Sequence, residues 1–234
     1  MKVALLVFTW NEVEGMKVIM PRVDSDLFHQ IIIVDGGSTD GTIEWAREQG
    51  YQVHVQTQKG LRHAYNEALE LVTGDIVITF SPDGNSIPEL LPDLIAKMED
   101  GFDMVIASRY LDGAKSEDDS LITAFGNWLF TATVNVLYGG SYTDCMVIYR
   151  AWRSSLYKEL DIHLDETFEF YEKLYRTKLG IEPLLSVRAL KRNLKVGEIP
   201  GDEPPRIGGH RKLQIIKWGL SFYTSFFREL WFWK

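Results

Sequence analysis

The sequence predicts an α/β fold with a mostly parallel central sheet and flanking helices. Strand-like and helix-like segments alternate through the first half of the 234-residue chain, which is typical of parallel strands joined by right-handed crossovers. The run Ile31–Val34 has four β-branched residues in a row, which indicates a strand buried on both faces. Polar turns follow several of these strands, at the sheet edge where open α/β proteins bind ligands.

Each element is predicted from its apolar pattern and from the turn residues that flank it. Strands are expected at Val3–Phe8, Ile31–Val34, Tyr51–Val55, Asp75–Phe80, Met104–Ala107 and Met146–Tyr149. Helices are expected at Glu12–Met20, Thr42–Gln49, His63–Leu71, Pro88–Met98, Leu121–Leu137 and Glu166–Leu179.

Composition narrows the class of protein. The net charge of −8 argues against nucleic acid as the main partner. Between Arg188 and Lys217, however, eight Lys or Arg stand against three Asp or Glu, which favours an anionic ligand or surface there. The single cysteine, Cys145, excludes an intramolecular disulfide and favours a reducing, cytoplasmic setting. No signal peptide and no membrane-spanning helix are expected.

Polar residues follow each of the first four predicted strands. Asn11 and Asp35 can match the donors of a nucleobase and a ribose, because amides and carboxylates pair with ring NH and hydroxyl groups. Arg62, after the third strand, can bind phosphate in a bidentate way. Asp83 and Asn85 put two oxygen donors two residues apart, which suits a hard divalent ion that also holds phosphates. Each pattern alone is more often a turn or a cap, but four in chain order indicate a nucleotide site.

The sequence disfavours a dinucleotide-binding fold and a P-loop fold. No G-x-G-x-x-G follows the first strand, and no G-x-x-x-x-G-K-[ST] loop is present. A nucleotidyltransferase would carry a Gly-rich, basic loop after the first strand, and 9–14 is not such a loop.

The chain resembles the inverting family 2 glycosyltransferases of the GT-A fold, the fold of nucleotide-diphospho-sugar transferases. The segments that carry the resemblance are T-W-N-E at 9–12, V-D-G-G-S-T-D-G-T at 34–42, R-H-A-Y-N-E-A-L at 62–69 and S-P-D-G-N-S-I-P-E at 81–89. The nearest subgroup resembles the dolichyl- or polyprenyl-phosphate mannosyltransferases, through S-R-Y at 108–110 and R-I-G-G-H-R-K at 206–212.

The resemblance implies a role for each matching residue. Nucleotide-sugar contacts are implied for Thr9, Asn11, Glu12, Asp35, Asp40 and Lys212. Arg62 is added to this set because its guanidinium can bind a phosphate of the nucleotide-sugar. Asp83 and Asn85 are implied to hold Mg²⁺ or Mn²⁺ on the diphosphate. Arg206 is implied to neutralise the diphosphate during transfer, and Arg109 to face an anionic acceptor.

The chain departs from the family pattern at several positions. Gly36 replaces the second acid of the V-D-D-G motif, and Ser81 replaces the first acid of the D-x-D motif. The subgroup's second acceptor arginine has no counterpart among residues 121–128. A sugar hydroxyl acceptor would need a general base, whereas a phosphate acceptor needs none. Asp144, Asp165 and Glu166 are the catalytic candidates for that role, and a helix cap is the alternative for Asp165.

The expected organisation is a glycosyltransferase domain at 1–212 and an aromatic, amphipathic helical tail at 213–234. The tail suits a helix lying at a membrane interface, and a helix that closes the core or contacts another subunit is the alternative. The sequence thus predicts a hexosyltransferase that moves a sugar from GDP-mannose or a UDP-hexose to a polyprenyl phosphate at the cytoplasmic face. The alternatives are transfer to a glycan hydroxyl, or binding of a nucleotide-sugar without catalysis.

Overall fold

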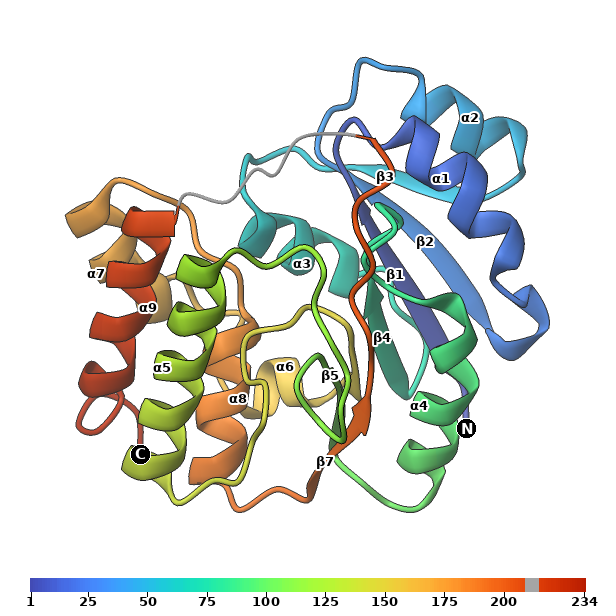
Figure 1. The fold of residues 1–234 in the computed structure, drawn as a ribbon. Coiled ribbons are helices and arrows are strands. Elements are labelled where there is room, and N and C mark those ends of the chain that lie inside the picture. The colour runs from blue at the N-terminus through green and yellow to red at the C-terminus, as the bar shows by residue number, and fades with distance from the viewer. Residues whose placement is uncertain (209–214) are drawn as a thin grey trace.

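A seven-stranded sheet forms the centre of the computed structural model, which describes residues 1–208 and 215–234 (Figure 1). The strand order is β3-β2-β1-β4-β6-β5-β7, and β6 alone runs antiparallel to its neighbours. The strands are β1 (Val3–Thr9), β2 (Gln30–Asp35), β3 (Gln52–Val55), β4 (Ile76–Phe80), β5 (Met104–Ser108), β6 (Arg150–Arg153) and β7 (Val196–Pro200). The predicted fold class is confirmed.

Helices cover both faces of the sheet. One face packs against α1 (Val13–Ile19), α2 (Thr42–Glu48) and α4 (Leu91–Glu99). The other packs against α3 (Leu61–Leu69), α5 (Leu121–Tyr138), α6 (Leu156–Glu159), α7 (Asp165–Tyr175), α8 (Glu182–Lys191) and α9 (Ile215–Arg228). Short 3₁₀ helices are η1 (Met20–Arg22), η2 (Ser25–Leu27) and η3 (Pro88–Leu90). In Figure 1, α5, α7, α8 and α9 stand together beside the sheet, so the second half of the chain forms a helical layer.

The predicted elements of the first half lie within about two residues of the observed ones, but the second half differs. The strand predicted at Met146–Tyr149 is wrong, because β6 begins at Arg150. The Asp144 carboxylate accepts the N–H groups of Met146 and Val147, which holds that segment in a turn instead of a ladder. The expectation also missed α6, α8 and β7.

Helix α5 is long, apolar and largely exposed. A capping box of Ser120 and Thr123 begins it, and Gly139 in the left-handed region ends it. Its 18 residues carry no charge, and by length and composition it could cross a membrane, with 17% of the helix buried inside the structure. The expectation that no helix meets this criterion is therefore wrong.

Helix α9 packs into the layer formed by α5, α7 and α8. Phe222, Phe226 and Trp233 lie in the same apolar core as α8. Arg188 of α8 forms an ion pair with Glu229 at 2.9 Å, and both side chains are fully buried. The described part of the predicted tail is thus anchored to the main fold, and a division into two domains remains a prediction.

Candidate active site

The turn after β2 is organised by Asp35. Its Oδ1 accepts the N–H groups of Gly37 and Ser38 at 2.8 and 2.7 Å. Its Oδ2 accepts the hydroxyls of Thr9 and Ser38 at 2.7 and 2.6 Å. The side chain is fully buried. All the acceptor positions of this carboxylate are therefore used to shape the turn.

The turns after β1 and β2 form one hydrogen-bonded unit, which we call the donor turn (residues 9–12 and 35–42). Asn11 has φ of 54°, and its Oδ1 accepts the N–H of Thr39 at 2.8 Å. The Glu12 N–H donates to the Thr42 hydroxyl at 3.0 Å. Burial raises the pKa of Asp40, but hydrogen bonds from Thr42 and Val13 outweigh burial and lower it. The turn brings together the predicted residues Thr9, Asn11, Glu12, Asp35 and Asp40.

The structure gives a reason for Gly36. A Cβ at this position would lie 3.3 Å from Cβ and Cγ of Trp10. Trp10 is half-exposed at the carboxyl end of β1. The missing acid of the family motif therefore coincides with an indole packed over the glycine.

The turn after β4 holds the predicted metal ligands. Asp83 Oδ1 accepts the Asn85 N–H at 3.1 Å, and Asp83 Oδ2 pairs with Arg206 Nη1 at 2.5 Å. The Asn85 Nδ2 donates to the Pro204 carbonyl at 2.7 Å, which leaves the buried Asn85 Oδ1 without a hydrogen-bond partner. A buried amide oxygen that has no hydrogen-bond partner and lies beside a carboxylate is a suitable ligand for a hard divalent cation. Among the described residues no group of three or more His, Cys, Asp or Glu could hold a metal, so substrate oxygens or water would have to complete the shell.

Residues 201–207, which we call the strap, cross this turn. The Ile207 N–H donates to the Asp83 carbonyl at 2.7 Å. The strap also pairs with the acidic loop 112–120, where Ser116 forms an isolated bridge to Glu203 and donates its hydroxyl to that side chain. Arg206 Nε lies 3.4 Å from Asp118 Oδ2. The strap and the acidic loop thus close one side of the site together.

Arg109 lies at the end of β5 among carboxylates. Its guanidinium holds Asp144 through Nε at 2.6 Å and Nη2 at 3.1 Å, and its Nη1 lies 3.4 Å from Glu203. Burial raises the pKa of Glu203, an effect that the charge of Arg109 opposes. The two predicted residues Arg109 and Asp144 therefore form one buried pair at the wall of the site.

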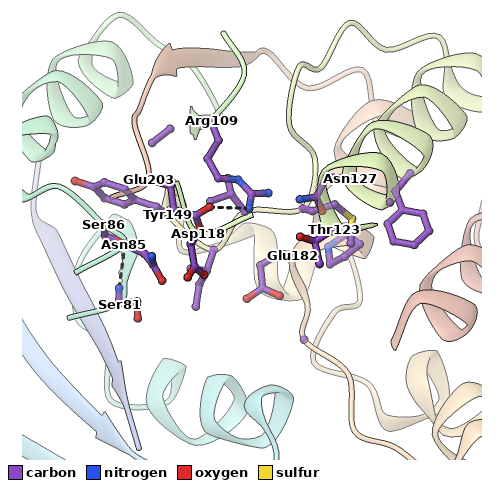
Figure 2. A pocket seen from close by; sticks show the side chains of 18 of the residues that line it. Ser81, Asn85, Ser86, Arg109, Asp118, Thr123, Asn127, Tyr149, Glu182 and Glu203 are labelled. Carbon is purple, nitrogen blue, oxygen red and sulfur yellow. Dashed lines mark hydrogen bonds and ion pairs between the residues drawn. The ribbon is translucent and has the colours of Figure 1, made fainter. Parts of the chain in front are cut away.

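A cleft of about 380 Å³ joins these groups (Figure 2). One end holds Ser81, Asp83 and Asn85, and its middle holds Arg109 and Glu182. The other end is formed by side chains of α5 and α9, and its largest apolar members are Phe130, Trp218 and Phe222. A single cleft thus runs from the predicted metal ligands to an apolar region between two helices.

Glu182 is a cleft residue that the sequence analysis missed. It is the first residue of α8, and its side chain is 5% exposed. Burial raises its pKa, against the hydrogen bond from Tyr65 and the charge of Arg150. Figure 2 shows its carboxyl group between Ser81 and Asn85 on one side and Thr123 and Asn127 on the other. A carboxylate directly before a proline in an apolar segment was the available signal.

Arg62 and Asp165 lie in a second cavity of about 480 Å³, outside the cleft. Arg62 is almost fully buried and pairs with Asp165 at 2.5 Å and with Glu172 at 3.1 Å. The hydrogen bond from Arg62 lowers the pKa of Asp165. Asp165 is not a side-chain cap, because Leu164 is the N-cap of α7. Their assigned roles in sugar-nucleotide binding and base catalysis remain predictions, and Lys212 lies outside the described residues.

An apolar surface lies beside the apolar end of the cleft. On α5, Leu121 is 91% exposed, and Ile122, Phe125 and Trp128 are also exposed. Leu220 of α9 is exposed as well. Helix α9 packs against α5, so these side chains lie on neighbouring helices.

The fold and the cleft together define a glycosyltransferase of the GT-A type. The model of the family "Glycosyl transferase family 2" matches residues 9–161, and the chain belongs to this family. The protein is therefore an enzyme of the glycosyltransferase class, as the sequence predicts.

Two curated relatives are similar over nearly the whole chain. Undecaprenyl-phosphate mannosyltransferase of Micrococcus luteus is 26% identical, over 94% of this chain and 95% of its own. Dolichyl-phosphate hexose transferase of Haloferax volcanii is 26% identical, over 95% and 91%.

A solved structure shares the fold. It is glucosyl-3-phosphoglycerate synthase of Mycobacterium tuberculosis in complex with Mn²⁺, UDP and glucosyl-3-phosphoglycerate. It has a TM-score of 0.62 with 16% identity and covers 96% of this chain and 77% of that one.

Proposed function

We propose that this glycosyltransferase moves a hexose from a nucleoside-diphosphate sugar to a polyprenyl phosphate at a membrane surface. The observation that carries the proposal is the single cleft that joins Asp83 and Asn85 to the apolar walls of α5 and α9. A polar end suits a diphosphate and a sugar, and an apolar end suits a prenyl chain. The names of the two curated relatives, which act on polyprenyl phosphates, support the same acceptor.

The donor turn is assigned to the nucleoside. Asn11, Asp35 and Asp40 fix the shape of the turn through their own hydrogen bonds. In this assignment the turn presents a rigid edge to the base and ribose, so little ordering is needed on binding. GDP-mannose and UDP-hexoses are the donors we consider.

Asp83 and Asn85 are assigned to a divalent cation, Mg²⁺ or Mn²⁺. Such an ion would neutralise the leaving diphosphate and fix its orientation. Arg206 already contacts Asp83, so its guanidinium is within reach of the same phosphates. In the transfer step an acceptor oxygen bonds to the anomeric carbon, the bond from that carbon to the diphosphate breaks, and the sugar inverts its configuration.

Arg109 is assigned to the acceptor side. Asp144 holds its guanidinium through two hydrogen bonds, which orients the remaining Nη1 toward Glu203 and the cleft. A phosphate acceptor is already anionic and needs no base. The role of Arg109 would then be to hold that phosphate in line with the anomeric carbon.

A second candidate acceptor is a sugar hydroxyl, and Glu182 favours it. A hydroxyl must lose a proton as it attacks, and a buried carboxyl whose pKa is raised is suited to take one. Asp144 and Asp165, the two aspartates among the candidates from sequence, are both paired with arginines in this structure. Glu182 is therefore the better general base if the acceptor is a glycan.

The exposed face of α5 and α9 is assigned to the membrane. Exposed apolar side chains such as Leu121, Phe125 and Trp128 suit the headgroup region of a bilayer. The apolar end of the cleft lies between the same two helices. A prenyl acceptor could thus enter from the bilayer at the cytoplasmic face without crossing water.

Two assays test the proposal. The first measures the melting temperature with UDP- and GDP-sugars, with and without Mn²⁺, because a ligand of the native state raises it. The second measures transfer to a short-chain polyprenyl phosphate and to a glycan, with Asp83→Ala as the test variant and Asp26→Ala, at an exposed site away from the cleft, as the control. We expect Asp83→Ala to lose at least about 100-fold in turnover. Absence of any stabilising nucleotide-sugar, or turnover indifferent to metal and to Asp83→Ala, would refute the proposal.

A further inference from the structure

Tyr65 and Glu182 link the two halves of the chain inside the core. Tyr65 lies on α3, and Glu182 begins α8, 117 residues later. The Tyr65 hydroxyl donates to Glu182 Oε1 at 2.7 Å. Tyr65 is 1% exposed and does not line the cleft, whereas Glu182 does. The phenol thus contacts the cleft only through the carboxyl group.

The Glu182 carboxyl group has little freedom. A side chain at Gly180 would overlap Oε2, so the absence of a Cβ there leaves room for the carboxyl group. The Glu182 carbonyl accepts Arg150 Nη1 at 3.2 Å, and the same nitrogen donates to Ser186 at 2.9 Å. The backbone of Glu182 is therefore fixed by Arg150 and its side chain by Tyr65.

Arg150 and Tyr65 are two groups near Glu182 that stabilise its ionised form. Arg150 is almost fully buried on β6, and its guanidinium donates hydrogen bonds to carbonyl, hydroxyl and thioether groups. Burial raises the pKa of Glu182, and the Tyr65 hydrogen bond and the charge of Arg150 oppose that effect without cancelling it. Tyr142, another buried phenol on this side, donates to the Ser186 carbonyl instead. Among the described residues, the ionisable groups elsewhere in the cleft wall are Asp83, Asp118, Asp202, Glu203, Arg109, Arg206 and Tyr149.

We propose that Tyr65 is a positioning residue that aims the Glu182 carboxylate at a hydroxyl group of the transferred sugar. The phenol occupies one acceptor position on Oε1, and a carboxylate has about four such positions, so the group can still accept an O–H from the substrate. The sugar of a donor held at Asp83 would lie next along the cleft, which is where Glu182 lies. The inference rests on the proposed function and makes the Tyr65–Glu182 pair the determinant of which sugar is accepted.

The test compares Tyr65→Phe with the wild-type protein on a panel of nucleotide-sugars that differ in the configuration or presence of one hydroxyl. We expect kcat/KM for the preferred sugar to fall about 10-fold or more, and the preference over its epimers and deoxy analogues to narrow by a similar factor. The affinity for the free nucleoside diphosphate should not change. The acidic limb of the pH profile should move to higher pH, because the carboxylate loses a donor.

Tyr142→Phe is the matched control, since it removes a buried phenol that bonds to the same helix but not to Glu182. We expect it to leave sugar preference and the pH profile unchanged. Glu182→Gln provides a second route, because it should narrow the preference even if Tyr65→Phe folds poorly.

An equal loss for every sugar with an unmoved pH profile, or an unchanged preference in Glu182→Gln, would overturn the inference while leaving the proposed function standing. A wild-type protein that binds no nucleotide-sugar would instead refute the proposed function, and this inference with it.

Discussion

The donor turn and the far wall of the cleft use carboxyl groups in opposite ways. At the donor turn Asp35 accepts four hydrogen bonds, two of them from backbone N–H groups within three residues. At the far wall Glu182 has a single side-chain partner, Tyr65, which is 117 residues away in the chain. A carboxylate whose acceptor positions are all used by the protein holds the backbone in shape. A carboxylate that keeps an acceptor position can bind a substrate. The comparison predicts losses of stability at the first site and losses of activity at the second.

The largest expected effect is on stability at the donor turn. Asp35→Ala leaves the Gly37 and Ser38 N–H groups and the Thr9 hydroxyl without their acceptor. We expect the free energy of unfolding to fall by about 3 kcal/mol or more. Urea denaturation measures this, with Asp35→Asn as the control that keeps one acceptor oxygen. An unchanged midpoint for Asp35→Ala would show that the turn does not depend on this carboxylate.

At the far wall, Glu182→Gln should reduce kcat/KM about 100-fold if the carboxylate acts on the reacting groups. Stability should not fall with it. Because burial raises the pKa of Glu182, its ionised form disfavours the folded state, and that cost grows as the pH rises above the ordinary value of 4.5. The variant should therefore be at least as stable as the wild type at pH 7. Steady-state kinetics and melting curves test both parts, and a large loss of stability with full activity would reverse the comparison.

Glu67, like Asp35, is a carboxylate that accepts several hydrogen bonds, and the pH dependence of stability tests its contribution. Burial opposes the effect, but hydrogen bonds from Thr57, His54 and Gln58 lower the pKa of Glu67 from 4.5 to about 2. Its contribution to stability is then present above pH 4.5 and is lost as the pH falls toward 2. Glu67→Gln should cost about 1 to 2 kcal/mol at pH 7. Unfolding free energies from pH 7 to pH 2.5 should show this difference shrink, and a difference that grows on acidification would contradict the assignment.

The smallest expected effect is at Gly36. An added Cβ would press on Trp10, but that indole is half-exposed and can move by a few tenths of an ångström. We expect Gly36→Ala to change stability by no more than about 0.5 kcal/mol. Thermal denaturation measures it, and Trp10→Ala in the same background removes the contact. A loss of 2 kcal/mol or more would mean that Trp10 is held rigidly.

Local sequence patterns predicted the part of the donor turn that follows β2, because Asp35 bonds there to Gly37 and Ser38, its near neighbours in the chain. The strand Gln30–Asp35 and the glycines and hydroxyls after it are adjacent in the chain, so hydrophobic runs and turn residues identify them. The same holds for the first five strands. Beyond residue 110 the prediction was less accurate, since side chains such as Asp144 decide whether a segment extends or turns.

The sequence by itself determined the fold class and the family, because apolar periodicity and short motifs of adjacent residues carry them. It also determined the turn after β2, where Asp35 bonds to the N–H groups of Gly37 and Ser38. The tertiary structure alone decided which charged groups face the cleft. It pairs Arg62 with Asp165 outside the cleft and Arg109 with Asp144 at its wall. It also brings Tyr65 of α3 against Glu182 of α8. Such pairings join residues 35 to 117 positions apart, and no local pattern encodes a contact that arises only when distant elements pack together.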